Sequence, residues 1–485
     1  KGNASAQANL GSLYLAGNQV PRDIARGLAW IRMAAAQNNP QALFDLGVAT
    51  AGGLGMPKDP AGGVALYQRS ADLGNAMAQN NLGDAYRDGV GVEKDALKAF
   101  QWFQKASDAG SPDGKVNLGI AYLTGLGVAK DGAKGQALLQ QAADKGSAAA
   151  RYSLAIVYRD GLGGMPKDLK KATALLQTAA GQGSVEAQIN LGIQYQNGIG
   201  VTKDVPRAAA LYQKGVDRGN ALAQRILGEI YFIGLAEIPP DPARGVELLR
   251  KAAAQNDSVA QFNLGVAYML GRGVTADPVQ ATAWYQKSAD QGDIKASINL
   301  GMAYRDGQGV PKDPTRAAAL FQKAAEQGVA LAQTNLGQLY LTGTGVEKDI
   351  AKGLEWTRKA AAQNETTAQK NLGIAYLNGL GVAPDNAEAI RWLQKSADGN
   401  NPEAQAVLGT LYRLGRGVPQ DYAKALALLT KSAEQNSPPG QTGLAILYYD
   451  GLGVAKDLAK ARSLFEQAAA RGDVEAINAL KKIGG

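Results

Sequence analysis

The chain has 485 residues, and it contains neither cysteine nor histidine. This composition excludes disulfides, thiol nucleophiles and thiolate metal sites, and it removes the commonest general base and metal ligand. The 51 basic and 43 acidic residues give a net charge of +8, which is mild for this length and does not indicate a nucleic-acid partner. No apolar run approaches membrane-spanning length. Because the chain opens at Lys1, we expect its natural start, with any signal peptide or lipid anchor, to lie upstream.

One short pattern recurs along the whole chain. A leucine followed by Gly or Ala returns every 36 residues, or 37 on reaching Leu191 and Leu264, at Leu10, Leu46, Leu82, Leu118, Leu154, Leu191, Leu227, Leu264, Leu300, Leu336, Leu372, Leu408 and Leu444. A repeat of this length indicates a stacked array. We therefore predict thirteen units forming one continuous solenoid over 1–472, with an irregular unit at about 220–256 and a C-terminal capping helix over 473–485.

Each unit predicts two helices. Four residues after the Leu comes Tyr, except at Thr50, and seven after it comes Gly in every unit, which supplies a left-handed stop. A short loop then ends in an invariant Asp, such as Asp95, that is expected to cap a second helix. Gly or Asn follows fifteen residues later, so the second helix should be about fourteen residues long. The fold class is all-α, with no strand signal.

Residue size suggests how the helices of a unit pack. The residue after the repeated Leu is Gly in eleven units, and small residues such as Ala34 and Ser70 stand eleven positions after the Asp. We expect the two to face each other and bring the backbones close together. All five tryptophans stand seven positions after the Asp, where Leu also occurs, and are predicted to be core residues.

The combined pattern, Leu-Gly-x-x-Tyr-x-x-Gly-x-Gly-Val-x-x-Asp followed by Lys-Ala-x-x-x-Gly, resembles the Sel1-like repeat family, a relative of the tetratricopeptide repeats. The resemblance covers nearly the whole chain. It implies a right-handed α/α superhelical solenoid whose first helices line a concave surface. It also implies adaptor or scaffold roles, mostly in bacteria and often in the cell envelope. The family shares no catalytic residues, so the resemblance implies a protein without catalytic activity or cofactor.

Two rows of polar residues on the first helices are candidates for partner binding. Arginine recurs near the end of the first helix at Arg87, Arg159, Arg305 and Arg413. One interpretation is that Arg87, Arg159 and Arg305 form solvated ion pairs with the Asp that follows each of them. The other is that the arginines form a row in the groove that binds carboxylates or phosphates. Asn precedes the repeated Leu at Asn81, Asn117, Asn190, Asn263, Asn299, Asn335 and Asn371. By analogy with tetratricopeptide repeats this row could bind the backbone of an extended peptide, and a hydrogen-bond ladder between repeats is the alternative.

Apolar residues add two further candidates. Phe44, Tyr152 and Phe262, two positions before the Leu, could form pockets for partner side chains. The seventh unit loses its loop signature and places Phe232 and Ile233 near Pro239 and Pro240. This unit is either a bent, re-packed joint or an apolar docking patch.

Two tempting motifs have structural explanations. The Gly-x-Gly loops follow a helix, whereas a nucleotide-binding loop follows a strand. The Asp-containing loops lack oxygen ligands at alternating positions, which calcium requires.

The leading hypothesis is a scaffold that binds a peptide or protein segment in the concave groove, in a secretion or signalling context. The alternative is an exopolysaccharide or glycan assembly factor of the bacterial envelope. An enzyme and an RNA-binding protein are both disfavoured. We expect a periplasmic or envelope location, with the cytoplasm as the alternative.

Overall fold

A computed structural model describes residues 2–483 and confirms the all-α fold class. This range contains 27 α-helices and one short 3₁₀ helix. Within it, the only β-type pairing is an isolated bridge between Leu235 and Ile238, in the irregular seventh repeat. The chain divides into two compact units between Asp241 and Pro242. The single continuous array over 1–472 stays a prediction.

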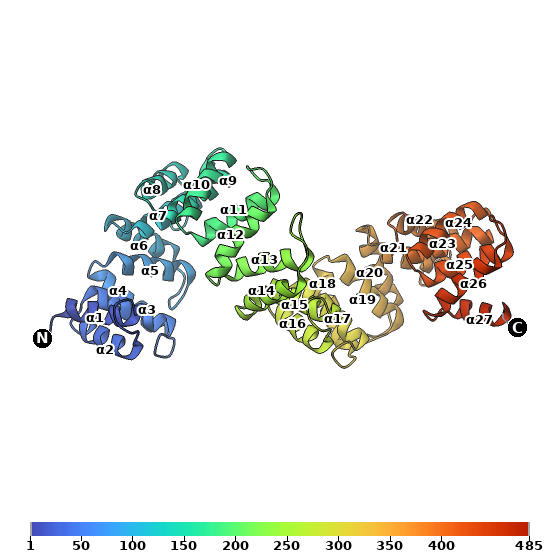
Figure 1. The fold of residues 1–485 in the computed structure, drawn as a ribbon, viewed down its shortest axis with the longest axis horizontal. Coiled ribbons are helices and arrows are strands. Elements are labelled where there is room, and N and C mark those ends of the chain that lie inside the picture. Colours follow the sequence, from blue (N-terminus) through green and yellow to red (C-terminus); the bar gives the residue numbers. More distant parts are fainter. Residues whose placement is uncertain (1, 484–485) are drawn as a thin grey trace. The chain divides into compact units, whose positions relative to one another are not determined.

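The first unit contains α1 to α13 and the 3₁₀ helix η1 (Figure 1). The helices are α1 (Ala4–Ala16), α2 (Ile24–Ala35), α3 (Pro40–Gly52), α4 (Pro60–Asp72), α5 (Ala76–Asp88), α6 (Ala96–Asp108), α7 (Pro112–Thr124), α8 (Gly132–Asp144), α9 (Ala148–Asp160), η1 (Leu162–Gly164), α10 (Leu169–Gly181), α11 (Val185–Asn197), α12 (Val205–Asp217) and α13 (Ala221–Ile233). Odd-numbered helices are the first of each pair, and α13 is the first helix of the seventh repeat.

The second unit begins with the second helix of that repeat. Its helices are α14 (Pro242–Ala254), α15 (Ser258–Leu270), α16 (Pro278–Asp290), α17 (Ile294–Asp306), α18 (Pro314–Glu326), α19 (Ala330–Thr342), α20 (Ile350–Ala362), α21 (Thr366–Asn378), α22 (Asn386–Asp398), α23 (Pro402–Leu414), α24 (Tyr422–Glu434), α25 (Pro438–Asp450), α26 (Leu458–Ala469) and α27 (Val474–Ile483). No helix within 2–483 has the length and apolar character that crossing a membrane requires.

The predicted caps and stops define the helix ends. Asp95 accepts the Lys98 N–H at 2.9 Å through its side chain, while its own N–H donates to the Tyr86 carbonyl at 2.9 Å. Gly89 ends α5 with φ of 73°, and Asn256 follows α14 with φ of 68°. The second helices are 12 or 13 residues long, slightly shorter than predicted.

The first helices also have caps, which the sequence analysis missed. Asn75 and Ser111, at the ends of their repeats, accept the N–H groups of Ala78 and Gly114 at 2.9 and 3.0 Å. Val329 stands at the equivalent position before α19 and makes no side-chain cap bond.

The predicted partner of the repeated glycine is wrong. A Cβ built on Gly301 would lie 2.7 Å from Cε1 of Phe321, and one built on Gly83 would lie 2.5 Å from Cε1 of Phe103. The glycine therefore faces a large buried residue eight positions after the Asp, on the second helix of its own repeat. The small residues eleven positions after the Asp face the next repeat instead, because a Cβ built on Gly114 would lie 2.5 Å from that of Ala106.

The prediction that the tryptophans are core residues is also wrong. All five are half-buried, and the fully buried side chain is the residue that follows, such as Phe103 after Trp102. Trp102 packs one side against the cluster that contains Tyr67 and Leu82. The Lys105 ammonium lies 4.0 Å from the centroid of the indole ring. A large ring with one wet face stabilises the helix surface without being enclosed.

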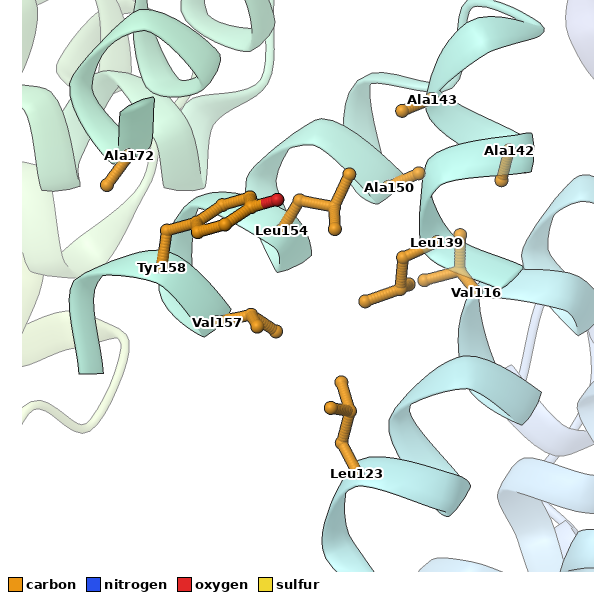
Figure 2. Close-up of a cluster of buried hydrophobic side chains, with 10 residues drawn as sticks. All are labelled: Val116, Leu123, Leu139, Ala142, Ala143, Ala150, Leu154, Val157, Tyr158 and Ala172. Atoms are coloured by element: carbon orange, nitrogen blue, oxygen red, sulfur yellow. The ribbon is translucent and has the colours of Figure 1, made fainter. Parts of the chain in front are cut away.

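The hydrophobic core runs from repeat to repeat. Figure 2 shows one cluster in which α7, α8 and α9 contribute Leu123, Leu139 and Leu154, and Ala172 of α10 contacts the same group. Each second helix contacts both its own first helix and that of the next repeat within each unit. A single pair would leave one of these faces in water, so burial depends on the neighbour.

Buried glutamines tie consecutive repeats together. Gln79 and Gln188 donate to the carbonyls of Ala71 and Ala180, in the last turn of the preceding helix, at 3.2 and 3.1 Å. In repeats with a second glutamine at the end of the second helix, that glutamine donates to the Oε1 of the first, in the pairs Gln37–Gln7, Gln291–Gln261, Gln363–Gln333 and Gln435–Gln405. Ala109 replaces it in the third repeat, and the buried Oε1 of Gln79 has no partner.

We predict that Gly301→Val destabilises the second unit by about 1–3 kcal/mol, because it overpacks the contact with Phe321. Valine is used because Ala155 and Ala445 show that two repeats accommodate a methyl group at this position. Segment-resolved unfolding by hydrogen exchange should split into two transitions, since repeats couple mainly through neighbours. A single unshifted transition would contradict this. Gly52→Val is the control, because a Cβ there has no heavy atom within 4 Å.

We predict that Ala109→Gln raises the free energy of unfolding by about 0.5–1.5 kcal/mol, because its amide can donate to the unpaired Oε1 of Gln79. Ala109 is exposed, so the longer side chain fits. Urea denaturation measures the change. Ala109→Met, which has similar length but no donor, should not stabilise, and equal effects of the two substitutions would refute the hydrogen-bond explanation.

Candidate functional site

The first helices share one face that lies mostly outside the hydrophobic core clusters. Positions five before, one before and two after the repeated Leu have spacing i, i+4 and i+7, so they lie on one side of the helix. We call this the first-helix face. On α5 it consists of Met77, Asn81 and Asp84, and on α19 of Leu331, Asn335 and Gln338. Its exposed large apolar residues are Val48, Met77, Ile120 and Leu222 in the first unit, with Val259 and Leu331 in the second, between 36% and 48% exposed.

The predicted asparagines lie half-buried on this face in every case. Asn117 donates to the side chains of Asn80 and Asp84 on the preceding first helix, at 2.9 and 3.2 Å. Asn190 donates to the hydroxyl of Tyr152 at 3.3 Å. Thus several members of the row, Asn117 and Asn190 among them, bond across repeats.

Asn81 and Asn299 bond to buried tyrosines of the preceding repeat. Burial raises the pKa of Tyr67, and the hydrogen bond with Asn81 opposes that effect. Tyr285 and Asn299 form the equivalent pair. Asn263 and Asn371 occupy the same register. A role for the row in partner binding stays a prediction.

Three of the predicted arginines hold a carboxylate of their own chain. Arg159 donates through Nε and Nη2 to both oxygens of Asp160 at 2.8 and 2.7 Å, and through Nη1 to Asn190 at 3.0 Å. Arg305 makes the same set of contacts, with both Asp306 bonds at 2.7 Å and an Asn335 bond at 2.5 Å. Hydrogen bonds from the arginines lower the pKa of both aspartates. The structure thus joins the arginine and asparagine rows into one network.

Arg87 and Arg413 depart from this arrangement. Arg87 holds Asp88 in the same way, but its Nη1 pairs with Asp84 at 2.8 Å. Arg413 is followed by Leu414 instead of an acid, and its buried Nε has no hydrogen-bond partner among the described residues.

The predicted aromatic residues lie mainly against their own repeat. The rings of Phe44 and Phe262 are 5.9 and 6.0 Å from those of Tyr67 and Tyr285, the large residues of the second helices. Both phenylalanines are half-buried, as is Tyr152. They are therefore only partly accessible to a partner.

The seventh repeat has a tight turn instead of the usual loop. Gly234 ends α13 with ψ of 149°, outside the left-handed helical region, and Leu235 and Ile238 exchange backbone hydrogen bonds. Phe232 is buried at 8% exposed, whereas Ile233 is 60% exposed. Of the two proposed docking residues, Ile233 is the accessible one.

In the second and third repeats the first-helix face carries two half-buried carboxylates, Asp45 and Asp84. Burial raises the pKa of Asp45, which accepts hydrogen bonds from Ser12 and Gln41 at 2.9 and 2.7 Å. Burial also raises the pKa of Asp84; Arg87 opposes this effect, while the nearby carboxylates Asp88 and Asp113 add to it.

A row of basic residues three positions after ten of the thirteen cap aspartates was not noticed in the sequence; Gly62, Gln280 and Glu388 interrupt it. The Lys98 ammonium lies 3.3 Å from the free oxygen of Asp95 and 5.2 Å from the ring centroid of Tyr86. Lys352 has the equivalent partners Asp349 and Tyr340. The signal was available, because a basic residue recurs at a fixed distance from both the Asp and the Tyr. These clamps tie the loop to the helix pair within one repeat.

The loop glycines have a structural role, as expected. Gly309 has φ of 72°, and a Cβ there would lie 2.0 Å from the Pro278 carbonyl oxygen of the previous repeat. Only glycine fits such an approach. Within 2–483, no cluster of three or more acidic side chains is arranged to hold a metal ion.

We predict that Asp45→Asn stabilises the protein at pH 7. Because burial raises the pKa of Asp45 in the folded protein, ionising this carboxyl costs stability. The free energy of unfolding therefore falls as the pH rises from 3.8, the ordinary pKa of an aspartate, through the pKa of the folded state. The advantage of Asn should therefore be full at neutral pH and vanish in acid, as measured by urea denaturation between pH 7 and pH 4.

Asp160→Asn is the control of opposite sign. Because Arg159 lowers the pKa of Asp160, the ionised Asp160 stabilises the folded state above pH 3.8. This stabilisation is lost as the pH falls through the pKa of the folded state. This variant should be less stable than wild type at pH 7. Stabilisation by both substitutions would contradict the assignment of the two environments.

Comparison with known families and structures agrees with the repeat boundaries. The sequence profile of the Sel1 repeat matches thirteen consecutive segments, at residues 4–39, 40–75, 76–111, 112–147, 148–184, 185–220, 221–257, 258–293, 294–329, 330–365, 366–401, 402–437 and 438–473.

Solved structures similar to the chain include two proteins with Sel1-type repeats. One is c5321, a protective antigen of uropathogenic Escherichia coli strains with an SLR fold, at 30% identity over 99% of this chain and 95% of that one, with a TM-score of 0.57. The other is a Sel1 repeat protein from Oxalobacter formigenes, at 31% identity over 64% of this chain and 89% of that one, with a TM-score of 0.48. Comparison with curated proteins gives no match.

Proposed function

Because the chain belongs to the Sel1 repeat family, whose solenoids generally serve as protein-interaction scaffolds, we propose that it binds a protein or peptide segment along its first-helix face. The observation that carries the proposal is the row of exposed apolar side chains on this face, among them Met77, Ile120 and Leu331. Each lies beside a polar network that is already satisfied within the protein. Isolated apolar anchors within a polar rim are typical of protein-binding surfaces.

The spacing of the anchors favours an elongated partner. They lie on several first helices, among them the consecutive α3, α5 and α7, rather than gathering in one deep pocket, so affinity would build up from modest contacts in several repeats. The half-buried aromatic rings at Phe44 and Phe262 support the same use of the face, because their accessible parts add apolar area.

We further propose that the protein acts by binding and not by catalysis. Sel1 repeat proteins are typically non-catalytic scaffolds. The titratable groups of the first-helix face support this view, since Asp160 and Asp306 are engaged by arginines and none forms a nucleophile–base pair with a histidine or cysteine.

The bacterial cell envelope is the proposed location, and a secretion or signalling assembly the proposed context. The similarity to a bacterial antigen over 99% of the chain supports the bacterial part of this proposal. Fractionation of the native cells tests the compartment, and recovery in the cytoplasmic fraction alone would contradict it.

Photo-cross-linking in the native cells tests the binding surface. A photoreactive residue at Ile120 or Leu331 should capture a partner, because both side chains are exposed on the first-helix face. The same group at Leu97 or Val279, which are 55% and 64% exposed on second helices, provides one matched control in each unit.

The product also identifies the class of partner. A cross-linked species that protease removes supports a protein partner, and one that only glycosidase removes would favour the glycan alternative. With the purified partner, Ile120→Glu plus Leu331→Glu should weaken binding at least tenfold, roughly 1.4 kcal/mol. Equal losses for Leu97→Glu plus Val279→Glu would refute the assignment of the face.

A further inference from the structure

One register position of the first helix is built to hold a carboxylate. Five residues after the repeated Leu, Arg87, Arg159 and Arg305 each grip the following Asp through Nε and Nη2, at 2.7 to 2.8 Å. Two parallel bonds from a planar guanidinium to two oxygens form the strong, directional mode of arginine recognition. The array therefore contains three internal examples of the same carboxylate site.

Arg413 occupies this register in the twelfth repeat without the groups that complete the site. Leu414 stands where Asp88, Asp160 and Asp306 follow the other arginines. Gly443 stands where Asn190 and Asn335 bond to Arg159 and Arg305 from the next first helix. Both internal partners are therefore replaced by residues that cannot accept a side-chain hydrogen bond.

Arg413 is therefore a cation with an unpaired hydrogen-bond donor. The Nε of Arg413 is buried and has no partner within the described part of the chain. A buried donor on a charged group that lacks its partner destabilises the folded state until something binds there. The equivalent Nε atoms of the other three arginines each donate to a carboxylate oxygen.

The side chains at the adjacent register positions, one aliphatic and one aromatic, are accessible. Leu414 is 54% exposed, and Tyr449, which has the register of Arg413 in the next repeat, is 37% exposed. A partner segment with an acidic group next to an apolar side chain would match this combination, since Arg413 could pair with the acid and Leu414 and Tyr449 could contact the apolar side chain.

We propose that Arg413 binds a carboxylate of the partner, namely an Asp or Glu side chain beside an apolar residue in the bound segment. The proposal rests on the proposed function, because it assumes a protein segment on the first-helix face. It deepens that function by naming one specificity-determining contact. A carboxylate is favoured over a phosphate because carboxylates fill the three equivalent positions.

Titration of the full chain, followed by NMR of the arginine Nε–Hε groups, tests the proposal. The probe is N-acetyl-Asp-Leu-amide at constant ionic strength, with N-acetyl-Asn-Leu-amide as its neutral control. The acidic dipeptide should shift the Arg413 signal saturably and leave those of Arg159 and Arg305 in place, and the neutral one should shift none. Tighter binding of inorganic phosphate than of the dipeptide would overturn the choice of carboxylate.

Three substitutions compare Arg413 with the arginines that already hold a carboxylate of the chain. Leu414→Asp restores the acid found beside the other arginines, so it should weaken binding of the dipeptide at least tenfold and raise the melting temperature. Leu414→Asn, of the same size but neutral, should do neither. Asp306→Leu removes the internal acid from Arg305, so a second signal should then respond to the dipeptide.

The outcomes separate this inference from the proposed function. An Arg413 signal that responds no more than those of Arg159 and Arg305 would overturn the inference, and so would equal effects of Leu414→Asp and Leu414→Asn. The cross-linking at Ile120 and Leu331 can still succeed in that case. Failure of that cross-linking, with a normal Arg413 titration, would instead count against the proposed function.

Discussion

The close packing of a glycine against a large buried side chain fixes the geometry of the helix pair in most repeats. Gly301 against Phe321 and Gly83 against Phe103 set how near the two helices of a pair approach. The small residues one turn further along the second helix, such as Ala106, then receive the next first helix equally closely. Both contacts must form together, because the second helix packs on both sides. A repeat is therefore stable only as part of a stack.

Many polar side chains form hydrogen bonds between consecutive repeats and so stabilise the stack. Gln79 and Gln188 satisfy carbonyls of the preceding helix, and Arg159 and Arg305 reach asparagines of the following one. Residues that look like a binding row in the sequence thus have a structural use first. What remains for a partner is the set of exposed apolar side chains and the places where the network is interrupted, of which Arg413 is the clearest.

The fold could be predicted from the sequence because its signals are local and repeated. Asp95, Gly89 and Asn256 act at the backbone of their own helix ends, and thirteen copies of the pattern make each signal unambiguous. The facing partner of Gly301 could not be predicted in the same way. Positions eight and eleven after the Asp lie on the same side of the helix, and only the three-dimensional register decides which meets the glycine.

The site was less predictable because its partners lie far apart in the chain. Arg159 and Asn190 are separated by 31 positions, and Gln291 and Gln261 by 30, so no local pattern pairs them. Helical spacing predicted that the asparagines share one face, but it gave no measure of how far each was already engaged. The partial exposure of Trp102 was hidden for a similar reason: it shares its position with leucines such as Leu66 and Leu138, which are also half-buried, and the pattern gave no depth of burial.

We propose that first helices bind the partner while second helices hold the stack. Hydrogen–deuterium exchange of the full chain, with and without its cross-linked partner protein, tests this claim most directly. We expect slower exchange on partner binding in first helices such as α7 and α19, with unchanged exchange in α6 and α16. Protection confined to the second helices would contradict the account.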